Sequence, residues 1–444
     1  MKFRGLLVAV VVLAALGGVL WWSQHHQPKP AESTPALPAI LKFDAKSVTG
    51  LTLHDKGAAP IVLTPGSGAA WQITAPSSFR ADSEAVNQIV AGLANLVPQR
   101  VVVDSTANLA SYGLGDPSIS VDVTEKNNQS AHLFLGDKTP TGDGIYAMIP
   151  GNPHVYTVGA WLDNQLNKSV DDLRDKHLIP VHTPDVNKLE IQRKGQDIAI
   201  ARVPGGWQIQ KPGTYRTNNY EVDNLLEQIV SATWDTSTNA AQAATEFAHG
   251  SPVATASVTT GSGANTNADS LEIRKSKDDY YAKSSAIPGA WKIDAALATA
   301  LDRNADAYRN KQLFDFGYTV PVSIEYHSGS TSLNLTYTAG AWYSDGKKMD
   351  PDSVNAFISA LRSLAAAKFV DSGYSRPDID LTVRAGGAHP PEAIHIQKTT
   401  DGAIAKRDDG QGLYFLDADT MNSFTKAVDG VKPAAPPAAP PKKK

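Results

Sequence analysis

An internal repeat constrains this chain more than any other feature of its sequence. Trp71, Trp207 and Trp342 stand 136 and 135 residues apart, and each follows two short runs in which apolar and polar residues alternate. The runs are Val48–Leu53 and Ile61–Leu63, Leu189–Gln192 and Ile198–Arg202, and Val322–Tyr326 and Leu333–Tyr337. Such alternation is typical of half-buried antiparallel strands. The sequence therefore predicts three copies of one structural unit.

A helix is predicted after each tryptophan. The three segments carry apolar residues at i, i+3, i+4 and i+7, which form one stripe along a helix. Asp82 and Asp350 are good N-cap residues, and Pro351 suits the first helical position. The stripes are Val86, Ile89, Val90, Leu93 and Val97; Val222, Leu225, Leu226, Ile229 and Val230; and Val354, Phe357, Ile358, Leu361 and Leu364.

The later part of each unit repeats as well. After the helix we expect two strands, a strand that carries a tyrosine, and a second helix. The strands are Ser118–Val123, His132–Leu135 and Val155–Val158; Val253–Thr259, Leu271–Arg274 and Tyr280–Lys283; and Ile379–Arg384, Ala393–Gln397 and Leu413–Leu416. In the first two copies Gly-Ala-Trp (159–161 and 289–291) precedes the second helix, and Arg-x-Lys-x-Leu (174–178 and 309–313) follows it. The third copy has Asp417–Val428 for this helix and lacks the closing motif.

The N-terminal segment predicts a membrane anchor. Lys2 and Arg4 precede an uncharged apolar run from Gly5 to Trp22, which is long enough for a membrane helix. Trp21 and Trp22 suit the aromatic belt of the interface, and the basic residues place the N-terminal tip in the cytoplasm. A cleaved secretory signal is the alternative, but no small-residue cleavage site follows the run. We expect a single-pass protein of the bacterial inner membrane whose C-terminal bulk lies in the periplasm or outside.

These features predict an α+β fold of three tandem repeats of about 135 residues, each with antiparallel strands and two packed amphipathic helices, after an N-terminal transmembrane helix. Proline, alanine and polar residues mark extended segments at both ends. The expected divisions are 1–22, cytoplasmic tip and signal-anchor; 23–40, Pro-rich linker; 41–180, 181–315 and 316–430, the three repeats; and 431–444, a disordered Pro/Ala/Lys tail.

Composition excludes several classes of function. The chain has no cysteine, so disulfides, thiolate catalysis and cysteine metal sites are impossible. Its formal net charge of −4 gives no electrostatic footprint for nucleic acid. The fold must therefore be held by burial of apolar side chains.

No familiar catalytic or metal-binding motif is complete in the sequence. Ser423 and Lys426 form a Ser-x-x-Lys without its companion motifs, so a solvated helix face explains them better. The eleven histidines are scattered, and His177 and His182 lie in a connector that contains Pro180. The juxtamembrane pair is His25 and His26.

Two acidic, glycine-containing segments are interpreted as loops. Residues 137–144 lack the ligand spacing of a calcium loop, and residues 408–410 fit a hairpin turn. Neither a Walker A nor a GxGxxG pattern occurs. We expect no enzyme activity, no cofactor, and no catalytic, cofactor-binding or metal-binding residues. The residues of any binding surface stay unassigned.

Two repeated features admit two interpretations each. The recurring tryptophans either build the same core in each unit or form platforms that stack on sugars; they are Trp71, Trp161, Trp207, Trp291 and Trp342. The basic residues of the closing motif either form a salt-bridged junction between repeats or bind an anionic partner; they are Arg174, Lys176, Arg309 and Lys311.

The assembled pattern resembles the bacterial family called Domain of Unknown Function 4340. The resemblance is best over residues 45–180 and rests on turn and core residues. They are Trp71-Gln72-Ile73, the Asp82-initiated helix, Tyr112-Gly113-Leu114 before Asp116-Pro117, Leu135-Gly136-Asp137, Gly144-Ile145-Tyr146-Ala147, Val155-Tyr156-Thr157-Val158 and Arg174-Asp175-Lys176. The second copy has Phe247-Ala248-His249-Gly250 and the third Ser372-Gly373-Tyr374 in place of Tyr-Gly-Leu.

The resemblance implies a single-anchor envelope protein without established activity, often encoded near ABC transporter components. We therefore expect a non-enzymatic binding or scaffold protein, anchored in the inner membrane through residues 5–22 and accessory to an ABC-type transport system. A cell-wall or polysaccharide-binding module is the alternative, and an envelope hydrolase is a third, weaker hypothesis. No nucleic-acid partner is expected, and the oligomeric state is not predicted.

Overall fold

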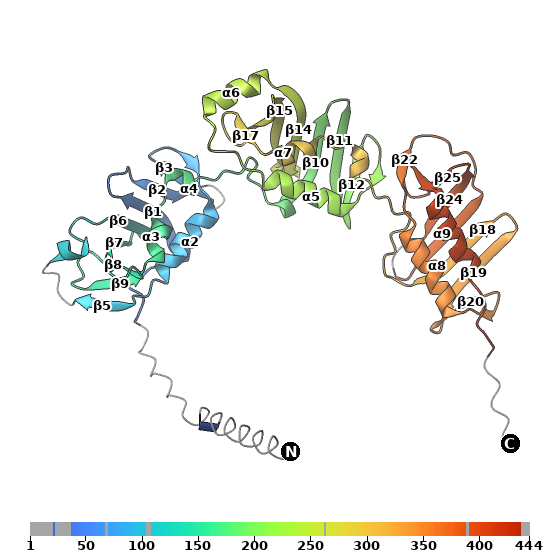
Figure 1. Cartoon of the computed structure of the whole chain (residues 1–444), viewed down its shortest axis with the longest axis horizontal. Coiled ribbons are helices and arrows are strands. Elements are labelled where there is room, and N and C mark those ends of the chain that lie inside the picture. Colours follow the sequence, from blue (N-terminus) through green and yellow to red (C-terminus); the bar gives the residue numbers. More distant parts are fainter. Residues whose placement is uncertain are drawn as a thin grey trace, which may run out of the picture. The chain divides into compact units, whose positions relative to one another are not determined.

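The computed structural model describes residues 21–22, 37–66, 70–103, 108–261, 263–387 and 390–436 (Figure 1). The chain forms two compact units, Met1–Lys176 and His177–Lys444, and the second unit contains the second and third copies. Within the described ranges no helix is both long and apolar enough to cross a membrane. The predicted anchor lies outside these ranges except for Trp21 and Trp22.

The first copy is a nine-stranded antiparallel sheet in the order β4-β3-β2-β1-β6-β7-β8-β9-β5. Its helices α2, α3 and α4 pack their apolar residues into one core against one face of the sheet. The strands are β1 (Val48–Asp55), β2 (Ile61–Pro65), β3 (Trp71–Ala75), β4 (Phe79–Arg80), β5 (Arg100–Val103), β6 (Ile119–Glu125), β7 (Ser130–Lys138), β8 (Gly144–Met148) and β9 (Val155–Gly159). The helices are α2 (Ser83–Ala94), α3 (Trp161–Leu166) and α4 (Val170–Leu173).

The second copy is an eight-stranded sheet in the order β13-β12-β11-β10-β14-β15-β16-β17. Helices α5 and α7 cover the same face as α2 and α3 do in the first copy. The strands are β10 (Val186–Arg193), β11 (Gln196–Val203), β12 (Gly206–Lys211), β13 (Tyr215–Arg216), β14 (Ser251–Thr260), β15 (Asn267–Ser276), β16 (Asp279–Ser284) and β17 (Trp291–Ile293). The helices are α5 (Asn219–Val230), α6 (Ala240–His249) and α7 (Ala295–Leu301).

The third copy returns to nine strands, in the order β21-β20-β19-β18-β23-β24-β25-β26-β22. Its two helices, α8 (Pro351–Ser363) and α9 (Ala418–Asp429), lie side by side over the sheet (Figure 1). The strands are β18 (Pro321–Ser328), β19 (Thr331–Thr338), β20 (Ala341–Ser344), β21 (Lys347–Lys348), β22 (Lys368–Val370), β23 (Ile379–Ala385), β24 (Glu392–Thr399), β25 (Gly402–Arg407) and β26 (Leu413–Asp417). The predicted α+β class and three antiparallel sheets are confirmed.

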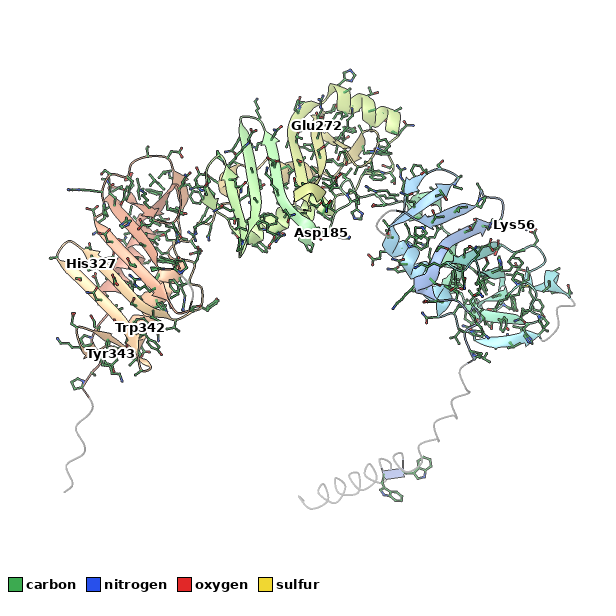
Figure 2. The ribbon with its side chains drawn as sticks, turned by 180° about the vertical axis from the view of Figure 1, so that it is seen from behind. Lys56, Asp185, Glu272, His327, Trp342 and Tyr343 are labelled. Atoms are coloured by element: carbon green, nitrogen blue, oxygen red, sulfur yellow. The ribbon has the colours of Figure 1, made fainter. Side chains whose placement is uncertain are left out.

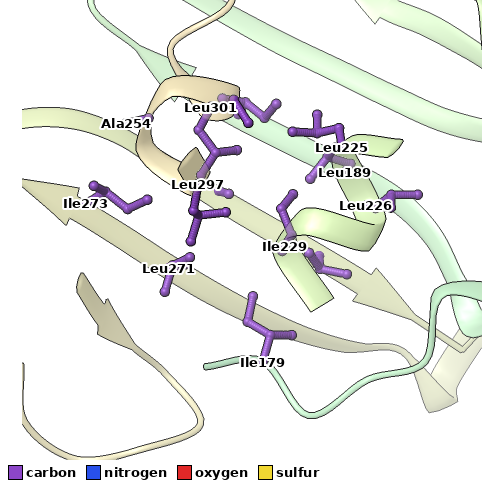
Figure 3. Close-up of a cluster of buried hydrophobic side chains, with 14 of the residues drawn as sticks. Ile179, Leu189, Leu225, Leu226, Ile229, Ala254, Leu271, Ile273, Leu297 and Leu301 are labelled. Atoms are coloured by element: carbon purple, nitrogen blue, oxygen red, sulfur yellow. The ribbon is translucent and has the colours of Figure 1, made fainter. Parts of the chain in front are cut away.

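The first helix of each copy forms for the predicted reasons. The Asp82 carboxylate accepts hydrogen bonds from the backbone N–H groups of Glu84 and Ala85 at 3.0 and 3.1 Å, and Asp350 caps α8 in the same way. The stripe of α5 packs against α7 and β15 in the core of the second copy, which Figure 3 shows. One stripe residue was wrong: Val97 follows the end of α2 and is 47% exposed.

The Gly-Ala-Trp segments are not equivalent, contrary to the prediction that both open a helix. Trp161 is the first residue of α3, whereas Trp291 begins strand β17, which pairs with β16. The tyrosine strand of the second copy, β16, corresponds in the sheet order to β8 and not to β9. The cause is a difference in length between copies, which moves similar tripeptides to different places in the same topology.

The chain leaves each copy along the same path. A residue after the second helix forms a bridge to the residue that precedes the first helix, as Ala81 does with Arg174 and Thr217 with Arg309. In the third copy Met349 pairs with Pro433, and Ala434 donates its N–H to the carbonyl of Lys348 at 2.9 Å. The segment from Val431 to Pro436, which the sequence assigned to the tail, therefore begins by completing the third copy.

A short segment of the first copy crosses to the second face of its sheet. It contains η3 (Leu109–Tyr112), and the Tyr112 ring packs edge-on against Tyr146, with 4.9 Å between ring centroids. Tyr146 alternates on β8 with the core residues Ile145 and Ala147, so it lies on the face away from the helices. Two glycines permit this close approach: Gly113 has φ of 69°, and a Cβ on Gly136 would collide with the Tyr112 carbonyl.

The other two copies cover the same region with different segments. In the second copy α6 buries Phe247 beside Tyr281, which alternates with core residues on β16. In the third copy a loop brings Gly373 against Ile404 on β25. The family-specific steps Tyr-Gly-Leu, Phe-Ala-His-Gly and Ser-Gly-Tyr are thus the covers of half of the second face.

Candidate functional site

The other half of the second face is polar, and we call it the open face. In each copy it is formed by the first three strands and the strand paired with the first of them: β1, β2, β3 and β6; β10, β11, β12 and β14; and β18, β19, β20 and β23. Its side chains alternate with those of the core and are half-buried or exposed. Figure 2 views the chain from behind and labels His327 and Tyr343, which lie on β18 and β20.

The open face of the first copy carries a histidine–aspartate cluster. His132 Nδ1 lies 2.5 Å from Asp122 Oδ1, and His54 Nε2 lies 3.4 Å from Asp122 Oδ2. The three side chains come from β7, β6 and β1, and each is between 35% and 47% exposed. The cluster offers donors and acceptors to a polar surface.

A related cluster lies on the third copy at neighbouring positions. His395 Nδ1 lies 2.5 Å from Asp380 Oδ1, and its Nε2 lies 3.0 Å from Asp408 Oδ1. His327 stands opposite Asp380 in the β18–β23 register, and its Nδ1 lies 3.0 Å from Ser332 Oγ. In the described part of the chain no group of three or more histidine and acidic side chains is arranged to hold a metal ion. These clusters are hydrogen-bonding surfaces.

The open face of the second copy is hollowed into a shallow groove of about 190 Å³. Glu190 and Gln192 of β10 line it together with Thr255 and Ser257 of β14, while Lys211 lies at one side. The groove is polar and accessible, so it is suited to contact with another polar surface.

The three repeated tryptophans are buried and belong to the cores. Trp71, Trp207 and Trp342 are 6%, 5% and 5% exposed. Trp71 Nε1 donates to Asn87 Oδ1 and Trp207 Nε1 to Asp223 Oδ1, each at 2.9 Å, so two of the rings are fastened to the first helix of their copy. The packing interpretation is confirmed for all three, and the sugar-platform interpretation is wrong for them.

The other two tryptophans have separate environments. Trp161 is 52% exposed at the start of α3. Trp291 packs on Trp234 with 5.0 Å between ring centroids, and its Nε1 donates to the Pro288 carbonyl. Because they occupy different places in the topology, they do not form a repeated platform.

The closing motif of the second copy forms a junction with the third. Arg309 is only 7% exposed, and its guanidinium lies 4.0 Å from the Tyr215 ring centroid and 3.6 Å from that of Phe369. Its Nη1 lies 3.0 Å from Asp306 Oδ1, and Lys311 Nζ donates to the Ala367 carbonyl at 3.3 Å. The junction interpretation is therefore confirmed for Arg309.

The closing motif of the first copy makes comparable contacts inside the first unit. The Arg174 guanidinium lies 4.1 Å from the Phe79 ring centroid, and Lys176 Nζ lies 3.1 Å from Asp171 Oδ2. An ion pair of 3.0 Å joins Arg80 to Asp175. Phe79 and Tyr215 occupy the same place on β4 and β13, so the stacked arginine is a repeated device.

A buried arginine extends the junction into the third copy. Arg407 is 2% exposed, and its Nε donates to Asp409 Oδ1 at 2.7 Å while its Nη1 lies 3.1 Å from Glu392 Oε2. Glu392 also accepts the Asp315 N–H at 2.7 Å, and Asp315 pairs with Arg216 of β13. Burial opposes the charge of Arg407, but the hydrogen bond and charge of Asp409 outweigh it and raise the pKa of the guanidinium.

The sequence did not reveal this network, because its members are far apart along the chain. One local signal was present: Arg407 follows Ala403 and Ala405 at alternate positions, so it continues the inward face of β25. An arginine at the end of a buried stripe requires acidic partners.

A pocket of about 500 Å³ lies beside Arg309. Asn218 and Glu221 at the start of α5 form one wall, the connector with Arg303 and Lys311 forms another, and Lys368 of β22 lies on the third. The pocket therefore carries more basic than acidic side chains.

The remaining candidate residues behave as the structural interpretations predicted. Ser423 and Lys426 are exposed on α9. Residues 137–144 form the turn between β7 and β8, and residues 408–410 lie between β25 and β26. His177 forms a bridge with Thr233 at the start of the second unit, while His25 and His26 lie outside the described residues.

Comparison with known proteins gives one family and shows the repeat independently. The model of the Domain of unknown function (DUF4340) matches residues 71–246 and again residues 207–381. The two matches begin at Trp71 and Trp207, so they are displaced by one repeat. No curated protein and no solved structure matches the chain. Because the two matches together cover more than half of the sequence, the chain belongs to the DUF4340 family.

Proposed function

We propose that this protein is a non-enzymatic binding or scaffold protein of the cell envelope, anchored in the inner membrane and accessory to an ABC-type transport system. The transporter enters through the family resemblance and the anchor through the sequence of residues 5–22. The observation that carries the binding role is the open face, which recurs in all three copies.

The chemistry of the open face supports a protein partner. It presents charged and hydroxyl side chains on a firm sheet, with Glu325 and Arg384 3.9 Å apart and both about half exposed. Pairs of this kind contribute little to stability in water, so they are available for contacts with a partner. Polar contacts of this type give specificity more than affinity, which suits an accessory subunit that docks on an already anchored complex.

The construction of the repeats also supports a scaffold. Each copy has its own core, and the cores of the second and third copies extend from Leu178 to Tyr308 and from Leu313 to Val428. Tandem units of this kind multiply one surface along the chain. A partner could thus engage equivalent positions on successive copies, and avidity would strengthen weak single contacts.

The cell-wall hypothesis loses its main support, because it relied on exposed rings at the Trp71-type positions and these rings are buried. Trp161 alone is half exposed among the repeated tryptophans. A single exposed ring is a weak basis for a polysaccharide groove, so wall binding becomes an outcome of the test.

The test is crosslinking and affinity isolation of the full-length protein from native membranes in mild detergent. The matched control is a form that lacks residues 1–22. We expect transporter subunits to be recovered with the anchored form and lost with the control, because the anchor raises the local concentration of the two proteins.

Recovery of the bait alone from membranes would contradict the transporter role. Sedimentation of the control form with purified cell wall would instead favour the polysaccharide-binding alternative. Either result changes the partner without changing the description of the fold.

A further inference from the structure

We propose that the pocket beside Arg309, called here the junction pocket, binds a small ligand that carries a phosphate-type dianion. This inference is independent of the transporter role, because it rests on side chains of the second unit alone. The pocket has a volume of about 500 Å³, enough for a phosphate group together with part of an organic carrier.

The charges around the junction pocket leave two lysines in excess. Glu221 is paired with Arg303 at 2.8 Å, and Asp306 is paired with Arg309 at 3.0 Å. These two pairs are neutral overall. Lys311 and Lys368 also line the pocket, and among the described residues no carboxylate lies within ion-pair distance of either ammonium. Two unneutralised ammonium groups on facing segments match a dianion.

The start of α5 adds a second attraction for an anion. In the first and third copies the helix begins at an aspartate whose carboxylate accepts two backbone N–H groups, as Asp82 and Asp350 do. In the second copy the N-cap is the neutral Asn218, whose side chain makes no capping hydrogen bond and lines the pocket. The positive end of a twelve-residue helix therefore faces the lysines without a negative cap.

Arg309 fixes the third contribution. Its side chain is held between the Tyr215 and Phe369 rings, and its Nη2 is buried without a hydrogen-bond partner among the described residues. An arginine keeps its charge at every accessible pH. The wall of the pocket thus has a permanent positive charge in a position that packing prevents from moving away.

The test is titration of the full-length protein with inorganic pyrophosphate, followed by isothermal calorimetry at low and moderate salt. We expect saturable binding that weakens as salt is added. The double variant K311Q/K368Q should weaken binding at least about tenfold, because it removes two charge-assisted contacts. Both lysines are exposed, so the variant should fold normally.

The variant N218D makes the test sharper. It gives α5 the carboxylate cap of the other two copies, so it should raise the unfolding temperature while it weakens pyrophosphate binding several-fold. The matched control is K176Q, which alters the equivalent lysine of the first copy and should leave binding unchanged. Absence of binding by the unaltered protein at millimolar pyrophosphate, or equal affinity of K311Q/K368Q, would overturn the proposal.

Discussion

The guanidinium of Arg309 lies 3.6 Å from the centroid of the Phe369 ring, and this contact joins the connector of the second copy to strand β22 of the third. Tyr215 stacks on the other side at 4.0 Å. A planar cation between two rings is a contact that arginine makes well and lysine does not. The residue that the sequence identified only as part of a closing motif is therefore the centre of the junction.

Replacing Arg309 should loosen this junction. We expect R309A to destabilise the second unit by about 2 kcal/mol, since it removes two stacked contacts and a buried charge pair. R309K should recover only part of the loss. Urea unfolding and limited proteolysis of the connector at residues 310–320 measure the effect. R384A is the control: its ion pair is half exposed at 3.9 Å, so the change should be below about 0.5 kcal/mol.

The tryptophan hydrogen bonds should be measurable by comparing two copies. W207F removes the bond from Nε1 to Asp223, whereas W342F removes none that the described residues show. Both variants lose ring volume in a similarly buried site. We expect W207F to cost about 1 kcal/mol more than W342F in urea unfolding, and D223A to reproduce that difference. Equal losses would mean that the bond contributes nothing beyond packing.

Asp409 should make the third copy sensitive to acid. Burial tends to raise the pKa of this carboxyl, but the hydrogen bond and charge of Arg407 outweigh burial and hold its pKa below the ordinary aspartate value. Because the folded-state pKa is depressed, the stabilisation is complete above the unfolded-state pKa, about 3.9, and disappears as the pH falls through the folded-state value.

D409N should therefore lower stability at pH 7 and flatten the loss of stability below about pH 4. The urea midpoint measured at several pH values tests this. D401N, in the exposed turn before β25, is the control and should keep the acid sensitivity of the unaltered protein. An unchanged acid limb in D409N would contradict the role of the Arg407 pair.

The end of the chain should stabilise the third copy. Pro433 pairs with Met349, and Asp350 donates its N–H to the Lys432 carbonyl at 2.9 Å. Truncation after residue 430 removes these contacts and exposes part of the α8 N-terminus, which should cost about 1–2 kcal/mol. Truncation after residue 436 is the control and should have no effect on thermal unfolding. Equal unfolding temperatures for both forms would show that the pairing is energetically neutral.

The periodic features of the sequence were sufficient to predict the repeat, the first helices and most strands. The stripe of α8 and the cap at Asp350 are local signals, and packing did not alter them. The equivalence of Trp161 and Trp291 failed because a repeated tripeptide was given more weight than the order of strands. The Arg407 network could not be predicted, since Arg216, Glu392 and Asp409 meet only through the folded topology.

The open face was also beyond prediction from the sequence. Alternation on β14 indicates that one side of the strand is polar, but it does not tell which half of that side another segment covers. That depends on where η3 and α6 cross the sheet. Tyr112 and Phe247 were visible as family motifs, but their role as covers required the structure.

The central claim, that the open faces bind a transport subunit, is tested most directly by site-specific photocrosslinking in native membranes. The crosslinking amino acid replaces Glu190 or Glu325 on the open faces, and Gln88 or Asn355 on the exposed sides of α2 and α8 as matched controls. The account predicts crosslinks to a transporter subunit from the two open-face positions only. Crosslinks from the helix positions alone, or to cell-wall glycan alone, would contradict it.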